Sequence, residues 1–286
     1  MKEVHVLNLG AGVQSTTLYL MAQASEIRPF DVAVCADTGE EPVAVYKHLE
    51  WLQSLNKTPI LVRSVGSRLG EDLRYGARPK GNNGRARFTS IPAYTFIEGE
   101  EAGRTKRQCS SEYKIEVIER TIRRDVLGLA PRKRIPKDVK VHQYYGISLD
   151  EKSRATRIWE RYHIDGEGNE PHFPLIDRMM TRANCLDWLE GKVPHQVPRS
   201  ACVFCPFHTD AEWQRLKDAG GPDWGRAVEV DHFLRTTGSV ANRDMRQSMY
   251  VHRSCKPIDE VDFRPKVNVK EMQLGFDVEC MGVCGV

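Results

Sequence analysis

The chain has 286 residues, of which 28% are charged, and its formal net charge at pH 7 is +3. This length suits one large domain or one domain with a small appendage, and so mild a charge does not by itself indicate a nucleic-acid binder. No apolar run is long enough to cross a bilayer, and no secretory signal precedes the first predicted strand. We therefore expect a cytoplasmic globular protein with no membrane partner.

The eight cysteines are too few for a disulfide scaffold in a chain of this size. Without a secretory signal, metal binding or redox chemistry is the better interpretation of their presence. They are Cys35, Cys109, Cys185, Cys202, Cys205, Cys255, Cys280 and Cys284.

The first informative stretch begins with an apolar run at residues 4–9, which predicts a strand buried on both faces. A turn of Gly10, Ala11 and Gly12 follows, and Ser15 and Thr16 then lead into a helical run at residues 18–22. Such a turn presents backbone N–H groups to an anion, and the two hydroxyls could add donors. An ordinary tight strand-to-helix turn is the open alternative, since a lone Gly-x-Gly is a weak signal and no Gly-Lys-Ser/Thr follows.

A second buried strand is predicted at residues 30–37, before a helix at 43–55 and a third strand at 59–65. Asp37 and Thr38 stand at the carboxyl end of the second strand. In a doubly wound sheet such polar groups line the ligand crevice. The alternative is that both residues only shape the turn and cap the helix.

No regular pattern covers residues 66–107. Within it, residues 76–88 are rich in glycine and basic side chains, which suits a loop over the crevice that contacts phosphates and bases, or a merely solvated loop. A helix is predicted at residues 111–127, where apolar positions keep helical spacing. A further basic cluster at 132–140 is either solvated surface or, with residues 120–124, a contact for a nucleic-acid backbone.

A fourth strand is predicted at residues 141–147, and it again ends in polar groups, with Gly146 at its end and Arg154 placed to reach a phosphate. Helices are predicted at residues 181–190, 211–219 and 224–236. Cys185 lies on the apolar face of the first of these and is expected in the core.

The second informative stretch is Cys202-x-x-Cys205 followed by proline, a turn in which two thiolates reach one metal centre or cluster. A single pair is incomplete and needs ligands from elsewhere in the chain. Cys280 and Cys284 lie in a glycine-containing terminus, where they are either ligands or a mobile reactive pair.

Taken in order, these motifs resemble the adenine-nucleotide α-hydrolase superfamily, in particular the PP-loop ATP pyrophosphatases and the sulfonucleotide (PAPS) reductases. Five motifs match the family: the turn at residues 10–15, the segment at 37–39, Arg107-Gln108-Cys109 with Lys114, the run at 173–176 with Trp188, and the Cys202/Cys205 pair. The set is most similar to the reductase-like proteins of phages and mobile elements. Gln14 brings the turn nearer to the reductases, whereas the family's Cys-Cys pair is here Gln108-Cys109 and its terminal histidine is missing.

The resemblance implies an α/β fold with a doubly wound, Rossmann-like parallel sheet at residues 1–195 and a small cysteine-rich, cluster-binding region at 196–286. It implies ATP with Mg²⁺ as the nucleotide, bound by Gly10, Ala11, Gly12, Gln14, Ser15, Thr16, Asp37, Thr38, Gly146 and Arg154. It also implies a [4Fe–4S] cluster held by Cys109, Cys202 and Cys205. The fourth ligand is Cys255, Cys280 or Cys284, or one iron stays open; zinc, with His208 as a ligand, is the alternative metal.

The function expected from this resemblance is an iron–sulfur sulfurtransferase that adenylates and thiolates a nucleobase in tRNA or DNA. Cys280 and Cys284 are the expected catalytic cysteines, and a sulfur donor and the nucleic acid are the expected partners, with a homodimer left open. Two alternatives remain. One is a sulfonucleotide reductase in which Cys280 attacks sulfur, and the other is a zinc-stabilised nucleic-acid binder without catalysis.

Overall fold

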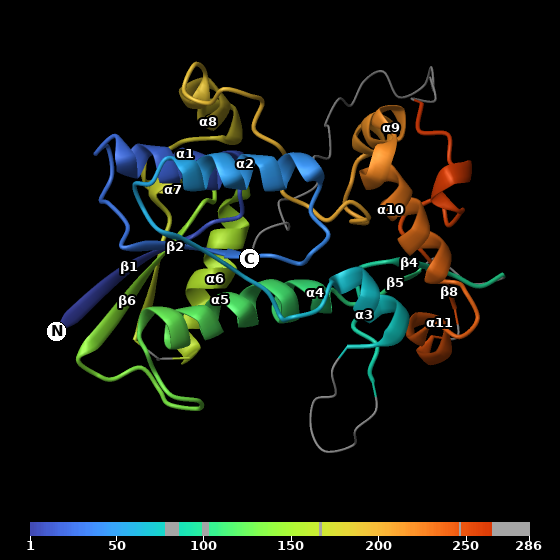
Figure 1. Cartoon of the computed structure of the whole chain (residues 1–286), viewed down its shortest axis with the longest axis horizontal. Coiled ribbons are helices and arrows are strands. Elements are labelled where there is room, and N and C mark those ends of the chain that lie inside the picture. Colours follow the sequence, from blue (N-terminus) through green and yellow to red (C-terminus); the bar gives the residue numbers. More distant parts are fainter. Residues whose placement is uncertain (78–85, 99–102, 166–167, 246, 265–286) are drawn as a thin grey trace.

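A parallel five-stranded sheet forms the centre of the computed structural model, with the strand order β3-β2-β1-β6-β7 (Figure 1). The structure describes residues 1–77, 86–98, 103–165, 168–245 and 247–264. Most residues of β1, β2 and β6 are buried, among them the valines of each strand, as expected of a sheet covered on both faces. The strands are β1 (Lys2–Asn8), β2 (Val32–Ala36), β3 (Ile60–Arg63), β6 (Val139–Tyr145) and β7 (Asn169–His172).

Helices cover both faces of this sheet and give the three layers visible in Figure 1. One face packs on α1 (Val13–Gln23), α2 (Val43–Ser54), α7 (Pro174–Asp177) and α8 (Arg182–Leu189), around a core that includes Leu7, Leu18 and Leu52. The other face packs on α5 (Glu116–Thr121), around a core that includes Val6, Val34 and Ile118, and on α6 (Lys152–Asp165). The expectation of an α/β fold with a parallel sheet is confirmed, and the architecture is compatible with a Rossmann-like fold.

The helix predicted at residues 111–127 exists and includes two π-helical turns. It runs through α4 (Gln108–Ser110), η1 (Ser111–Ile115), α5 and η2 (Ile122–Val126), with η1 and η2 wound as π-helix. Wide turns of this kind occur often at functional sites. Here η1 carries Lys114 toward the carboxyl edge of the sheet, where two cavities meet.

A second core lies beside the sheet and joins two separate parts of the chain. Leu69, Ile91 and Tyr113 from the middle of the chain pack with Phe204 and Trp213 from the later part. The elements around it are α3 (Leu69–Tyr75), α9 (Asp210–Ala219), α10 (Gly221–Phe233), α11 (Val240–Asp244), η4 (Ile258–Glu260) and a three-stranded antiparallel sheet of β5 (Gly103–Arg104), β4 (Tyr94–Phe96) and β8 (Ser248–Tyr250). The cysteine-bearing loop at residues 202–205 is thereby anchored against residues 69–113.

Several elements were not predicted. The segment 66–107, which shows no regular pattern, contains α3, β4 and β5, and the segment after residue 148 contains η3 (Leu149–Glu151), α6 and β7. In the described part of the chain, none of the helices combines the length and the apolar character that crossing a membrane would need.

Candidate functional site

The carboxyl ends of β1 and β6 meet where the strand order of the sheet reverses. The chain runs outward from β1 to β2 and β3 on one side, and then crosses to β6 and β7 on the other side. Ligands of doubly wound proteins bind in the crevice at this switch point. A Cβ atom on Gly146, which follows β6, would lie only 2.6 Å from the backbone N of Ser15. Gly146 therefore lets the two loops of the switch point touch.

The turn after β1 places N–H groups at the start of α1. Ala11 adopts a φ of +56°, a left-handed conformation uncommon outside glycine, and Gly12 follows as an extended N-cap with no side-chain hydrogen bond. The first intrahelical bond runs from Thr16 N to Gly12 O at 2.9 Å. The N–H groups of Val13, Gln14 and Ser15 therefore have no partner inside the helix, which is the arrangement that binds phosphates.

A buried histidine, His48, supports this turn from behind and is itself contacted by the exposed His195. Thr16 is fully buried, and its hydroxyl lies 2.8 Å from His48 Nε2, while His48 Nδ1 lies 2.8 Å from His195 Nε2. Burial, followed by the neighbouring His195, lowers the pKa of His48 to about 4. His48 is therefore neutral at pH 7 and fixes the hydroxyl of Thr16 within the core. The Ser15 hydroxyl instead donates to Gly12 O at 3.2 Å.

Gln14 and Arg154, both predicted to contact the nucleotide, lie in one polar network at the end of β6. The Gln14 amide donates to Glu151 at 3.2 Å and accepts from Arg182 at 3.1 Å. Arg154 reaches the other oxygen of Glu151 at 3.4 Å. Burial raises the pKa of the Glu151 carboxyl above its ordinary value. The two predicted residues are thus brought together, and Glu151 connects them.

An open cavity lies at the carboxyl ends of β1 and β2, and its polar wall is formed by Gly10, Asp37, Glu41, Tyr46, Lys114 and Ser200. Asp37 Oδ1 accepts hydrogen bonds from Gly39 N at 2.7 Å and from the Tyr46 hydroxyl at 2.9 Å. Lys114 donates to the buried carboxylate of Glu41 at 3.3 Å, and Ser200 donates to the other oxygen of that carboxylate. Gly10 and Asp37, predicted to bind nucleotide, thus face one cavity.

A second open cavity adjoins the first, because Lys114 stands in the wall of both. It is lined by all three cysteines predicted to share a cluster, together with Thr38 and Arg107: Cys109 comes from α4, and Cys202 and Cys205 come from the loop before α9. The Cys202 sulfur lies 3.2 Å from the Thr38 hydroxyl. Burial, and then the carboxylate of Glu41, raise the pKa of the Cys202 thiol. Residues distant in the sequence therefore converge on one small space.

Backbone bonds fix the shape of the loop that carries Cys202 and Cys205. Val203 N donates to Glu40 O at 2.8 Å, and Cys205 N donates to Cys202 O at 2.9 Å. The ring of His208 lies with Nε2 3.0 Å from the same Cys202 carbonyl. Burial lowers the pKa of His208 to about 4, so the neutral ring donates this bond. His208, considered above as a zinc ligand, supports the loop through its backbone.

The described cysteines do not form a group of three closely spaced ligand atoms. A tetrahedral zinc site brings its sulfurs to about 3.8 Å from one another. Within the described residues, the groups in which three ligand atoms lie within 4.8 Å of one another consist of histidines and carboxylates, with no cysteine among them. In an iron–sulfur cluster each cysteine binds a different iron, so wider spacing is needed. Three thiols around one cavity fit that donor set.

Arg107 lines the cysteine-lined cavity, and it shares an aromatic contact with Arg104. The guanidinium groups of Arg104 and Arg107 stack on Phe207 at 5.3 and 5.4 Å from the ring centre. The buried Nη1 of Arg107 has no hydrogen-bond partner in the described structure. This nitrogen of Arg107 can therefore donate a hydrogen bond to a bound anion or to a carbonyl oxygen.

The remaining predicted site residues lie elsewhere. Cys255 has a φ of +50°, its sulfur is 3.9 Å from Arg253 O, and it does not line the cavity. Cys280 and Cys284 fall outside the described residues, as does most of the basic segment at 76–88. Cys35 and Cys185, which were not predicted as site residues, are buried, and burial raises the pKa of these thiols to about 12 and about 11; Cys35 also lines the first cavity.

Comparison with known proteins does not extend this description: no protein-family model, curated protein or solved structure has a significant match to the chain. The proposed function is therefore based on the geometry of the two cavities.

Sequence reasoning missed several residues of the cavity walls. Glu41 was treated as part of a turn, and Ser200 only as a neighbour of the cysteine pair, yet both face Lys114. Tyr46 and His48 were counted only within a predicted helix. A polar residue at the inward position of an otherwise apolar helix was the available signal, since His48 follows Val45 on the buried face of α2.

Proposed function

We propose that this protein is an adenine-nucleotide-dependent, iron–sulfur sulfurtransferase that adenylates and thiolates a nucleobase in a nucleic acid. The observation that carries the proposal is the adjacency of two cavities with Lys114 in their common wall. One cavity lies at the carboxyl ends of β1 and β2, beside the switch point of a parallel sheet, and the other is lined by three cysteines. A nucleotide-activated substrate in the first would stand next to a sulfur centre in the second.

The first cavity and the adjoining turn after β1 are together suited to hold ATP. The unpaired N–H groups at the start of α1 would bind phosphate oxygens, and the helix dipole would favour their negative charge. Asp37, held by Gly39 and Tyr46, would accept a hydrogen bond from the ribose or the adenine. Attack of a nucleobase carbonyl oxygen on the α-phosphorus would release pyrophosphate, and a sulfur nucleophile would then displace AMP.

The residues of the second cavity are suited to hold an iron–sulfur cluster through Cys109, Cys202 and Cys205. When bound, such a cluster supplies a site that carries sulfur or transfers electrons. Lys114 and Arg107 bring positive charge to a group that thiolate ligands make negative. The buried Lys114–Glu41 pair also fixes the position of the ammonium group between the two cavities.

The nucleic acid would approach the mouth of the cysteine-lined cavity, where Arg104, Arg107 and Phe207 offer cationic and aromatic surface. The basic cluster at residues 132–140 is less suited to this role than its sequence suggests. It precedes β6 and so lies at the amino ends of the strands, away from the switch point (Figure 1).

The first test is anaerobic purification followed by iron and sulfide analysis. About four irons per chain are expected in the wild type, with a large loss in Cys109→Ser, Cys202→Ser and Cys205→Ser. Cys255→Ser is the matched control and should keep the wild-type iron content, because this sulfur does not line the cavity. Colourless protein with one zinc, and no cluster after reconstitution, would overturn the proposal.

The second test separates the sulfur-transfer reaction from a reductive one. The cluster-containing protein, given ATP, a sulfide source and nucleic acid, should release AMP and pyrophosphate and yield a thiolated base detectable by mass spectrometry. Sulfite released from an adenylyl sulfate without ATP would indicate a sulfonucleotide reductase instead.

A further inference from the structure

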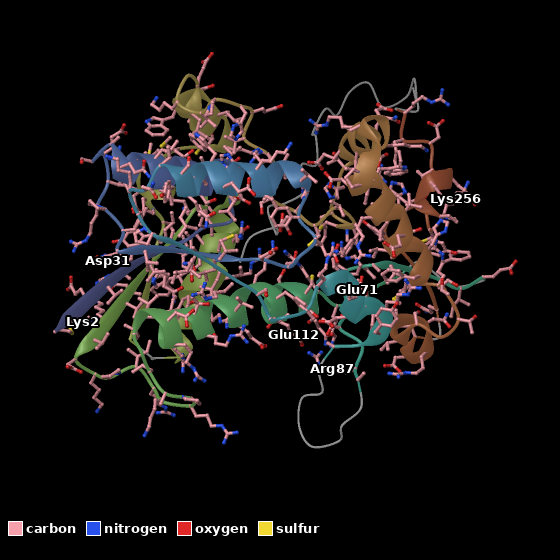
Figure 2. All side chains as sticks on the ribbon, viewed as in Figure 1. Lys2, Asp31, Glu71, Arg87, Glu112 and Lys256 are labelled. Atoms are coloured by element: carbon pink, nitrogen blue, oxygen red, sulfur yellow. The ribbon has the colours of Figure 1, made fainter. Side chains whose placement is uncertain are left out.

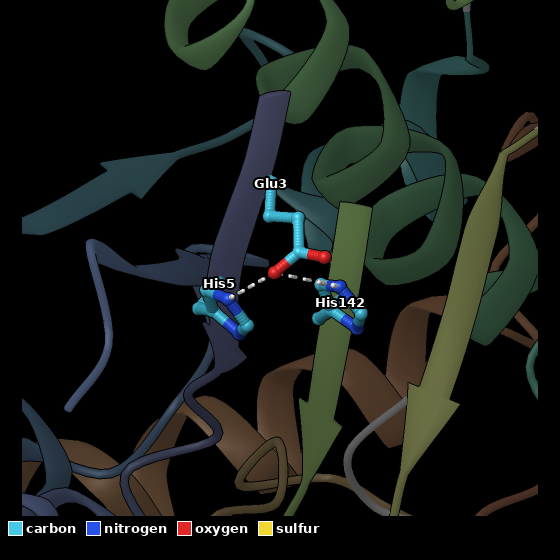
Figure 3. Close-up of side chains that lie close together, drawn as sticks. All are labelled: Glu3, His5 and His142. Atoms are coloured by element: carbon cyan, nitrogen blue, oxygen red, sulfur yellow. Dashed lines mark ion pairs between the residues drawn. The ribbon is translucent and has the colours of Figure 1, made fainter. Parts of the chain in front are cut away.

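A cluster of histidines and carboxylates lies at the amino half of the sheet, away from both cavities. Register pairs His5 on β1 with His142 on β6, so their side chains lie next to each other on the same face of the sheet. Glu3 precedes His5 by two positions and projects from that face, as Figure 3 shows. Neither the cysteine chemistry nor the nucleotide cavity uses these groups.

Two imidazole nitrogens in this cluster are buried and unpartnered. His5 and His142 are only 5% and 8% exposed, and the Nε2 atom of each has no hydrogen-bond partner in the described residues. His5 Nε2 lies 3.8 Å from Glu3 Oε2, and His142 Nε2 lies 3.9 Å from the same oxygen. Buried polar atoms are normally hydrogen-bonded, so two such atoms beside one carboxylate require a reason.

The opposite nitrogen of each ring is already engaged. His5 Nδ1 lies 3.0 Å from the Tyr144 hydroxyl, and His142 Nδ1 lies 2.9 Å from His172 Nε2. When each Nδ1 carries the proton and donates it, both Nε2 atoms present a free lone pair. Metal-binding histidines are oriented in this way, with the second nitrogen held by a hydrogen bond.

We propose that Glu3, His5 and His142 form a binding site for one divalent transition-metal ion. Two imidazoles and a carboxylate are the ligands of Zn²⁺ and of Co²⁺ or Ni²⁺ in its place, whereas Mg²⁺ and Ca²⁺ prefer oxygen alone. Tetrahedral coordination at ordinary bond lengths places ligand atoms about 3.4 Å apart. The observed 3.8 and 3.9 Å therefore need only a small contraction, which the half-exposed side chain of Glu3 can supply.

Metal binding also requires the two rings to move. They are stacked with centres 4.5 Å apart and planes 4° from parallel. Because an imidazole binds a metal in its own plane, both lone pairs meet at one ion only after the rings tilt toward Glu3. The ion would then join β1 to β6 at the amino end of the sheet, and it would stabilise the fold by mass action.

The test is a Co²⁺ titration of metal-free, full-length protein at neutral pH, followed by visible absorption. We expect one Co²⁺ per chain with d–d bands and without the thiolate charge-transfer band that the cysteines would add. Glu3→Gln should weaken this binding at least tenfold, and Zn²⁺ should raise the melting temperature of the wild type more than that of the variant. Glu3→Gln alters a half-exposed side chain, so we expect this variant to fold as the wild type does.

Glu170→Gln is the matched control. Glu170 is equally exposed, lies on the neighbouring strand β7, and belongs to a second group with His142 and His172. It should leave the Co²⁺ titration unchanged. Loss of binding in Glu170→Gln but not in Glu3→Gln would overturn the proposed ligand set, and wild-type protein that binds only with the thiolate band would overturn the site.

Discussion

At the scale of single residues, Gly146 has the most demanding surroundings in the site. A Cβ atom there would lie 2.6 Å from Ser15 N and 2.8 Å from Ser15 Cα, and backbone cannot move aside as a side chain can. We expect Gly146→Ala to separate the two loops of the switch point and to abolish nucleotide binding, measured by calorimetry with a non-hydrolysable ATP analogue. Gly225→Ala, a helical position with open space around it, is the control and should bind as the wild type does. Equal binding by both variants would contradict the assigned role.

Lys114 and Glu41 form the buried ion pair between the cavities, with side chains only 11% and 7% exposed. Removing one partner of such a pair leaves the other charge buried, at a cost of about 3 kcal/mol or more. Lys114→Met should therefore lower the free energy of unfolding by this amount in urea titrations. The double variant Lys114→Met/Glu41→Leu should recover part of the loss. Additive losses in the double variant would show that the two side chains do not interact.

At the scale of elements, Arg226 on α10 ties the later part of the chain to the turn after β2. It donates to both oxygens of Glu40, a fully buried carboxylate, at 2.7 and 3.0 Å. The carbonyl of Glu40 in turn holds Val203, within the loop of the cysteine pair.

Arg226→Met should therefore destabilise the protein by about 3 kcal/mol and also lower its iron content, because the cysteine loop loses its anchor. Arg243→Met removes an exposed pair with the adjacent Asp244 and should change neither quantity. Full iron content in a destabilised Arg226→Met would separate the two effects and contradict the anchoring role.

The predictability of each element follows from its burial. Strands β1 and β2 were predicted because a sheet covered on both faces selects apolar runs, and β6 was predicted from its valine and tyrosine residues. The edge strand β7 reads Asn-Glu-Pro-His and has no such pattern, since its position depends on pairing with β6. Helix α6 has six charged residues among its fourteen, and among its described side chains only Ala155 and Tyr162 are buried, so its sequence resembles a solvated loop.

The candidate site likewise contains features that the sequence predicts and features that it does not. The Cys202/Cys205 pair was recognised from its spacing, Cys109 was grouped with it through the family resemblance, and the three cysteines line one cavity. The contacts of Thr16 with His48, and of Glu41 with Lys114, join residues far apart in the sequence, and no local pattern encodes them. Local chemistry was therefore readable from the sequence, whereas the polar groups that position it were not.

At the scale of the whole molecule, the buried histidines make stability depend on pH. Burial lowers the pKa of both His48 and His208 from the ordinary value of 6.5 to about 4. The folded protein keeps these rings neutral, so between pH 6.5 and 4 the unfolded chain binds more protons than the folded one. Their contribution is thus fully present above pH 6.5 and is lost as the pH falls toward 4, with an upper bound on the order of 3 kcal/mol for each ring.

Urea unfolding at pH 7.5, 5.5 and 4.5 tests this dependence. The carboxylates titrate in the wild type and in variants alike, so the informative quantity is the difference between them. We expect His208→Gln, whose amide can still donate to the Cys202 carbonyl, to lose less stability than the wild type between pH 7.5 and 4.5. His232→Gln is the control, because His232 is half-exposed and pairs with Asp259 at the surface. If His208→Gln and the wild type lose stability in parallel, the neutral buried ring is not what links folding to pH.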